Sequence, residues 1–239
     1  MPSFLYVLEC LKAKHQMKGC ILSVDYSLSP EETYPTAQDN CVNAYRYLVH
    51  DLGLSPSRII VAGDSSGGNL AATVLLRIRD QRSDPVLATI PPIPLPAGCA
   101  LISPWVTMDL PQRTEKYYCD YVRISQIDYY RQNYVPRYDS MEASYREAFI
   151  RQPFISPLHG DFDDFCPTFV SYGGGELFEP QIAAFIDKLE KQHHVSVTVV
   201  SRPKTGHIHI VEPHVCRSKE IWRQDLTKFV DWCASTGGH

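Results

Sequence analysis

The chain has 239 residues, of which 44% are hydrophobic and 21% charged, as is usual for a globular protein. A net charge of −4, without a basic stripe along the chain, excludes an electrostatic surface for nucleic acid or for an anionic membrane. The longest apolar stretch, residues 85–105, is interrupted by six prolines between 85 and 104 and cannot form a membrane-spanning helix.

Eight cysteines are scattered along the chain without a C-x-x-C pair. They are Cys10, Cys20, Cys41, Cys99, Cys119, Cys166, Cys216 and Cys233. A zinc site requires clustered ligands, and disulfide frameworks belong mainly to short secreted chains. No secretory signal peptide is recognisable at the N-terminus. We therefore predict reduced thiols, no metal site and a cytoplasmic location.

Hydrophobic spacing predicts the elements of the first third of the chain. Residues 4–18 carry apolar side chains three and four positions apart, which predicts a helix, and residues 36–49 repeat this pattern. The short run 20–26, rich in apolar and β-branched residues, predicts a strand. Residues 58–63 predict a buried strand, followed directly by a helix over 67–82.

The rest of the chain continues the alternation of strands and helices. Apolar runs predict strands over 98–103, 167–172 and 195–201. Amphipathic runs predict helices over 179–192 and 218–233. Because strands alternate with helices, we predict an α/β fold with a mainly parallel sheet covered on both faces.

Residues 105–165 differ in character, since they are rich in tyrosine and charge and contain no strong strand pattern. We predict a partly helical, cap-like insertion over one edge of the core, within a single domain that covers residues 1–239. Aromatic residues in this insertion, such as Trp105, indicate either an apolar pocket or ordinary packing.

The segment Gly63-Asp64-Ser65-Ser66-Gly67 matches G-x-S-x-G between a predicted strand and a predicted helix. In that context the pattern predicts a nucleophile elbow, because small residues let the chain turn sharply and expose the serine hydroxyl. We predict Ser65 as nucleophile and the Ser66 N–H as an oxyanion donor at the helix N-terminus. The alternative is a glycine-rich helix start without chemistry.

The general base is expected after the last predicted strand, where the segment RPKTGHIHI contains two histidines. We favour His207, which follows Gly206 in a tight turn, over His209, whose role would then be packing or covering the site. The pair H-x-H is also compatible with a metal site, although no third ligand lies nearby in the sequence.

The orienting acid is expected after the preceding strand, and Glu176 is the first carboxylate there, behind three glycines. Its carboxylate would accept the imidazole N–H and stabilise the imidazolium. A helix-start glutamate is the alternative, and Glu179 fits that alternative better. The order Ser65, Glu176, His207 is the order of α/β-hydrolases.

These motifs resemble the hormone-sensitive-lipase-like branch of the α/β-hydrolase family, fold-3 type. SVDYSLSPEETYP (23–35) is similar to its V-D-Y-R-L-A-P-E-x-x-x-P turn, and VAGDSSGGNLA (61–71) to its V-x-G-D-S-A-G-G-N-L-A elbow. ALISPW (100–105) and ISPL (155–158) match further landmarks, and the G-x-x-E-L acid segment is most similar to fungal members. The resemblance implies hydrolysis of small or lipophilic carboxylic esters without a metal or organic cofactor.

One family motif is not found in this sequence, the H-G-G-G that supplies further oxyanion donors before the first long helix. The resemblance implies that the chain is N-terminally incomplete, beginning inside that helix, and that a strand between 20–26 and 58–63 is missing. Losing one oxyanion donor costs about 10²–10³ in kcat. Alternative functions are therefore a catalytically impaired fragment or small-molecule-binding pseudoenzyme, and an acyltransferase with the same residues. The sequence does not predict the oligomeric state.

Overall fold

The computed structural model describes residues 2–84, 87–112 and 120–237, and they contain one parallel sheet of four strands. Their order in the sheet is the order of the chain: β1 (Ile60–Asp64), β2 (Gly98–Ile102), β3 (Thr168–Gly173) and β4 (Val197–Arg202). All four coincide with predicted strands. Because the strands are parallel, their carboxyl ends meet at one edge, where the predicted site residues follow them.

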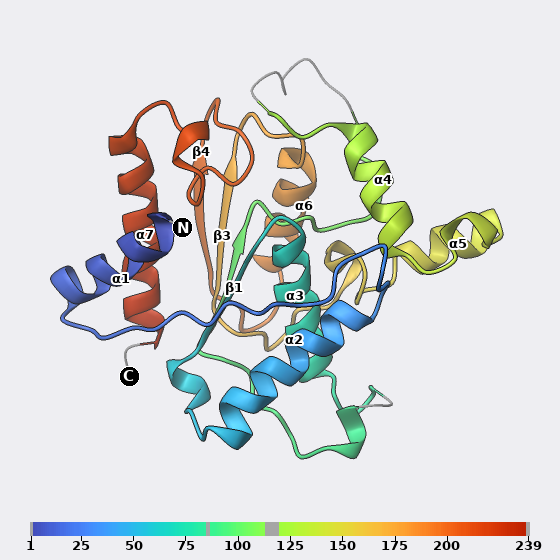
Figure 1. The fold of residues 1–239 in the computed structure, drawn as a ribbon, viewed down its shortest axis with the longest axis horizontal. Helices are drawn as coiled ribbons and strands as arrows, with labels where there is room; N and C mark the ends of the chain where they lie inside the picture. The colour runs from blue at the N-terminus through green and yellow to red at the C-terminus, as the bar shows by residue number, and fades with distance from the viewer. Residues whose placement is uncertain (1, 85–86, 113–119, 238–239) are drawn as a thin grey trace.

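Helices connect and cover these strands (Figure 1). They are α1 (Pro2–His15), α2 (Thr36–Arg46), α3 (Ser66–Arg79), α4 (Ile124–Tyr134), α5 (Ala143–Ile150), α6 (Glu179–Leu189) and α7 (Lys219–Gly237). A π-helical turn, Tyr47–Asp51, continues α2, and short 3₁₀ turns occur at Pro56–Arg58, Leu87–Thr89, Tyr138–Ser140, Pro157–His159 and Pro213–Val215. The helices outside the insertion agree with the predicted ones, and their ends differ by a few residues.

The two faces of the sheet bury separate cores, because successive side chains of a strand point in opposite directions. Along β2, Cys99 and Leu101 face the core formed with α2, α3 and α6. Ala100 and Ile102 face the core formed with α7 and α1. Figure 1 shows α1 and α7 together on one side of the sheet and α2 and α3 on the other. The predicted α/β fold with helices on both faces is confirmed.

The predicted strand over residues 20–26 is wrong. Residues 20–26 do not form a strand, and β1 is therefore an edge strand of the sheet, with no strand from this segment beside it. Its apolar side chains are largely exposed, with 41% of Ile21, 57% of Leu22 and 36% of Val24 accessible to solvent. An apolar run becomes a strand only where a neighbouring strand accepts its backbone hydrogen bonds. No described strand stands in that position.

The described part of residues 105–165 contains α4 and α5 and no strand. This segment contributes four buried side chains to the core on the α3 side of the sheet, those of Met108, Ile127, Val135 and Ile150. Cys119 lies outside the described residues, and none of the seven described cysteines forms a disulfide. Within the described ranges, no helix combines the length and the apolar character needed to cross a membrane.

Candidate active site

Ser65 lies in a sharp turn between β1 and α3. Its backbone has φ 54° and ψ −118°, a conformation that non-glycine residues rarely adopt and that the surrounding structure must hold in place. The close approach requires glycine at two positions. A Cβ on Gly63 would lie 2.0 Å from the carbonyl oxygen of Gly67, and a Cβ on Gly68 would lie 2.9 Å from the Cβ of Pro104. Glycine at positions 63 and 68 is therefore required by the close packing around the turn.

His207 lies in the loop after β4, and its Nε2 is 2.8 Å from the Oγ of Ser65. Only 3% of the histidine is exposed. The loop rests directly on the end of β3, where a Cβ on Gly173 would lie 2.3 Å from the carbonyl oxygen of Thr205. Glycine at this position thus lets the loop come close enough for the imidazole to reach the serine.

Glu176 is fully buried on the other side of the imidazole. Its Oε1 lies 3.6 Å from the Nδ1 of His207, an ion-pair distance longer than a normal hydrogen bond. Neither of these two atoms has a hydrogen-bond partner elsewhere in the described residues. The second oxygen, Oε2, accepts hydrogen bonds from the hydroxyl of Ser103 at 2.7 Å and from the N–H of Gly173 at 2.9 Å. The carboxylate is therefore held with its free oxygen facing the imidazole.

Ser103 is a site residue that sequence reasoning missed. It is fully buried just after β2, and its Oγ also accepts the N–H of Ile208 at 2.9 Å. One hydroxyl thus joins the segment that carries Glu176 to the loop that carries His207. Its position directly after a strand is the signal that would have identified it, since the other site residues follow strands too.

Ser66 is the first residue of α3, directly after Ser65. Backbone N–H groups in the first turn of a helix have no partner within the helix, and the helix dipole favours negative charge there. Ser66 therefore lies at the end of α3 that favours a negatively charged group.

An open cavity of about 470 Å³ adjoins Ser65 and His207. Its walls come from residues 26–30, α3, residues 105–108 and the segment around α4, and they are mainly aromatic and aliphatic. Tyr121 lines this cavity and makes an edge-on contact with His207, at 6.1 Å between ring centres. Burial, together with the neighbouring carboxylate of Asp120, raises the pKa of Tyr121 to about 12, so this side chain is uncharged at neutral pH.

His209 is fully buried, does not line the cavity and faces Asp225 on α7. Its Nε2 lies 3.5 Å from the Oδ2 of Asp225. The two imidazoles of the H-x-H pair thus contact different partners, Ser65 and Asp225. Groups of three or more potential metal ligands do not occur among the described side chains.

Comparison with known proteins finds hydrolases among the relatives of this chain. An esterase of Acinetobacter venetianus is 29% identical over 183 residues, which are 76% of this chain and 54% of the esterase. The hormone-sensitive lipase of Bos taurus is 52% identical over 71 residues, which are 28% of this chain and 9% of the lipase. The chain thus spans about half the length of the Acinetobacter esterase, 54%, and of lipase 2 from Moraxella sp., 49%.

Solved structures share the fold. A hormone-sensitive lipase from a metagenome library superposes with a TM-score of 0.73 and 23% identity, covering 97% of this chain and 70% of the lipase. A hormone-sensitive-lipase homologue, also from a metagenome library, gives a TM-score of 0.72 and 25% identity, covering 89% of this chain and 66% of the homologue. A family model described as alpha/beta hydrolase fold matches residues 9–211. With that match over most of its length, the chain belongs to the α/β-hydrolase fold family.

Proposed function

We propose that this chain hydrolyses carboxylic esters by acyl transfer through Ser65, with His207 as general base and Glu176 as the acid that orients it. The observation that carries the proposal is the hydrogen bond of 2.8 Å between the serine hydroxyl and Nε2 of the imidazole. A buried carboxylate faces the other ring nitrogen at 3.6 Å. Acyl transfer by a serine requires this arrangement, in which the nucleophile contacts the base and the base faces an orienting carboxylate.

The reaction proceeds in two halves. His207 accepts the proton of Ser65 as its oxygen attacks the ester carbonyl, and the resulting imidazolium protonates the departing alcohol. In the second half, His207 accepts a proton from the water that attacks the acyl-enzyme, and then returns this proton to the Ser65 oxygen as the acid is released. Glu176 keeps the proton on Nδ1 and stabilises the imidazolium. Catalytic contacts in unliganded sites are often long and shorten when substrate binds, which is compatible with the separation of 3.6 Å.

Negative charge develops on the carbonyl oxygen during both attacks. We assign the N–H of Ser66 as a donor to this oxygen, because it stands at the helix N-terminus beside the nucleophile. The cavity walls favour an apolar or lipophilic acyl or alcohol group. Residues 105–165, which contribute Trp105, Met108 and α4 to those walls, would then act as the cap of a single hydrolase domain.

Two measurements on the full chain test the proposal. The wild type is expected to turn over p-nitrophenyl butyrate and to be labelled at Ser65 by a fluorophosphonate probe, and Ser65→Ala is expected to lose both. Circular dichroism checks that each protein is folded. A folded wild type that is neither labelled nor active, or turnover that persists in Ser65→Ala, contradicts the proposal. Analysis of the products distinguishes transfer to water from transfer to another acceptor.

A further inference from the structure

The loop that follows β4 carries two histidines separated by a single residue, Ile208. His207 contacts Ser65 on one side of the loop, and His209 contacts Asp225 on the other. Ile208 has φ 52°, in the left-handed region that β-branched residues very rarely adopt. Its N–H donates to the Oγ of Ser103 at 2.9 Å. With the backbone in this conformation, His207 reaches Ser65 and His209 reaches Asp225. Such a conformation persists only where its surroundings hold it.

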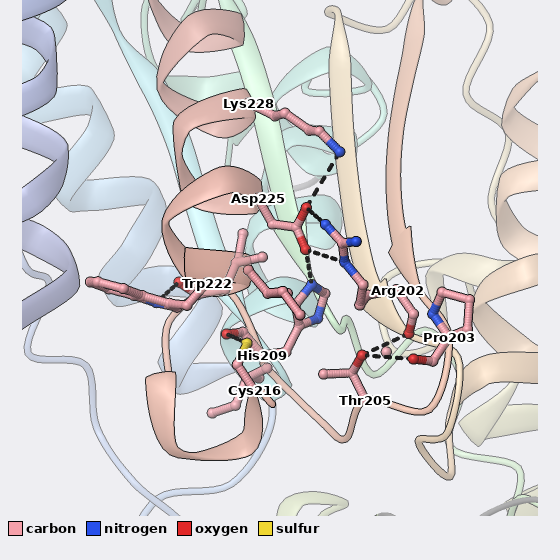
Figure 2. A network of polar contacts seen from close by, with 12 residues as sticks. Arg202, Pro203, Thr205, His209, Cys216, Trp222, Asp225 and Lys228 are labelled. Carbon is pink, nitrogen blue, oxygen red and sulfur yellow. Dashed lines mark hydrogen bonds and ion pairs between the residues drawn. The ribbon is translucent and has the colours of Figure 1, made fainter. Parts of the chain in front are cut away.

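Asp225, on α7, is the centre of the contacts on the far side of this loop (Figure 2). The carboxylate is fully buried and accepts two hydrogen bonds from the guanidinium of Arg202, at 2.9 Å and 2.6 Å. Lys228 approaches Oδ1 at 3.3 Å, and Nε2 of His209 approaches Oδ2 at 3.5 Å. Burial alone would raise the pKa of Asp225, but His209 and Arg202 outweigh it and hold that pKa well below its usual range. His209 therefore faces a carboxylate that is ionised at neutral pH.

The same network holds the loop at both ends. Arg202 is the last residue of β4, and its carbonyl oxygen accepts the hydroxyl of Thr205 at 2.8 Å. Trp222, on α7, donates its indole N–H to the carbonyl oxygen of Ile210 at 2.9 Å. His209 lies between these two attachments, as Figure 2 shows. Neither His209 nor Asp225 lines the cavity beside Ser65.

We propose that His209 and Asp225 are positioning residues that keep the loop in its left-handed conformation at Ile208, so that the imidazole of His207 stays within hydrogen-bond distance of Ser65. The pair acts through His207, because it touches neither Ser65 nor the cavity. The inference rests on the proposed hydrolase function. It predicts that breaking the pair impairs the chemical step and leaves substrate binding unchanged.

The experiment compares His209→Phe and Asp225→Asn with a matched control on the same helix. Asp231→Asn removes another α7 aspartate that pairs with a histidine and a lysine, His15 at 2.7 Å and Lys14 at 2.6 Å. For p-nitrophenyl butyrate, His209→Phe and Asp225→Asn are each expected to lower kcat by about tenfold or more, without a change in KM. The control is expected to keep the wild-type kcat.

A rescue variant separates positioning from a general loss of stability. Glycine adopts positive φ without strain, so Ile208→Gly added to His209→Phe is expected to restore part of the lost kcat. Failure of the glycine to restore any activity, or an equal loss in Asp231→Asn, would show a merely structural role. Wild-type kcat in His209→Phe overturns the inference directly. If His209→Phe does not fold, Asp225→Asn carries the same comparison.

A crystal structure of the His209→Phe variant tests the inference without relying on turnover. The distance between Ser65 Oγ and His207 Nε2, 2.8 Å in the wild type, is expected to increase beyond hydrogen-bond range. An unchanged distance overturns the inference. An inactive, unlabelled wild type would overturn the proposed function instead, so the two failures are distinguishable.

Discussion

Replacing Ser103 by alanine removes the single hydroxyl that joins the acid and base segments of the site. In the wild type, this buried oxygen donates to Glu176 Oε2 at 2.7 Å and accepts from the N–H of Ile208 at 2.9 Å. Alanine keeps the Cβ and loses both hydrogen bonds. We therefore expect Ser103→Ala to reduce both the stability of the fold and the rate of catalysis.

The stability change follows from the two lost contacts. A hydrogen bond to a charged group contributes about 1.5–3 kcal/mol, and a buried donor left without a partner costs about 1–3 kcal/mol. The two contributions are not fully additive, because both hydrogen bonds use the same oxygen and the loop at Ile208 can relax to find another partner for its N–H. We therefore expect the free energy of unfolding to fall by about 3 kcal/mol.

The rate change follows from the position of the carboxylate. Without Ser103, Oε2 of Glu176 keeps the N–H of Gly173 as its remaining donor, and one hydrogen bond leaves the carboxyl group free to pivot. Misplacing a catalytic group by about 1 Å costs up to about 10²-fold in rate. We expect kcat for p-nitrophenyl butyrate to fall by about 10- to 100-fold.

Urea denaturation and steady-state kinetics at neutral pH measure the two effects. Thr168→Val is the matched control, because Thr168 is also fully buried and its hydroxyl donates to the carbonyl oxygen of Cys166, at the opposite end of β3 from the site. This variant is expected to lose stability and to keep its kcat. The reasoning is refuted if Ser103→Ala unfolds at the wild-type urea concentration, or if its kcat equals that of the control.

Three further predictions concern the turn, the loop and the buried anion. Gly63→Ala is expected to destabilise the fold strongly, because its Cβ would lie 2.0 Å from a carbonyl oxygen. Gly67→Ala has no atom within 4 Å of its Cβ, so its free energy of unfolding is expected to rise by about 0.5–1 kcal/mol. Equal urea midpoints for the two variants would contradict this prediction. Gly173→Ala is expected to lower kcat by displacing Thr205, whose carbonyl oxygen would be 2.3 Å from the new Cβ, and an unaltered kcat would argue against that displacement. Because the pKa of Asp225 is lowered on folding, its carboxylate stabilises the fold above the unfolded-state pKa of about 3.9, and this stabilisation is lost as the pH falls through the folded-state pKa. The free energy of unfolding of the wild type is thus expected to fall more steeply below about pH 4 than that of Asp225→Asn, and parallel acid-unfolding curves would exclude this contribution.

The sequence was sufficient to predict the strands of the sheet and the places where site residues follow them. The run before Ser65 is apolar and β-branched, and the small residues around the serine allow a sharp turn, so both signals are local. The carboxyl ends of parallel strands share one edge. For that reason, the positions of Ser65, Glu176 and His207 after predicted strands were enough to predict that they meet.

The strand predicted over residues 20–26 shows where local reasoning fails. Its composition suits a strand, but pairing depends on a neighbour, and the neighbour is not encoded in the segment itself. Ser103 was missed for a similar reason. Its hydroxyl has a role only because the acid and base segments, distant in sequence, come to the same place.

The sequence by itself determined the order of strands and helices, the elbow at Ser65 and a short choice of candidates for acid and base. The tertiary structure alone decided which histidine faces the serine and which faces α7, because that choice depends on the backbone conformation of Ile208 and on the buried carboxylate of Asp225. Periodicity and turn residues act over a few positions of the chain. Contacts between segments more than 100 residues apart, such as Ser65 with His207, are fixed only when the sheet assembles.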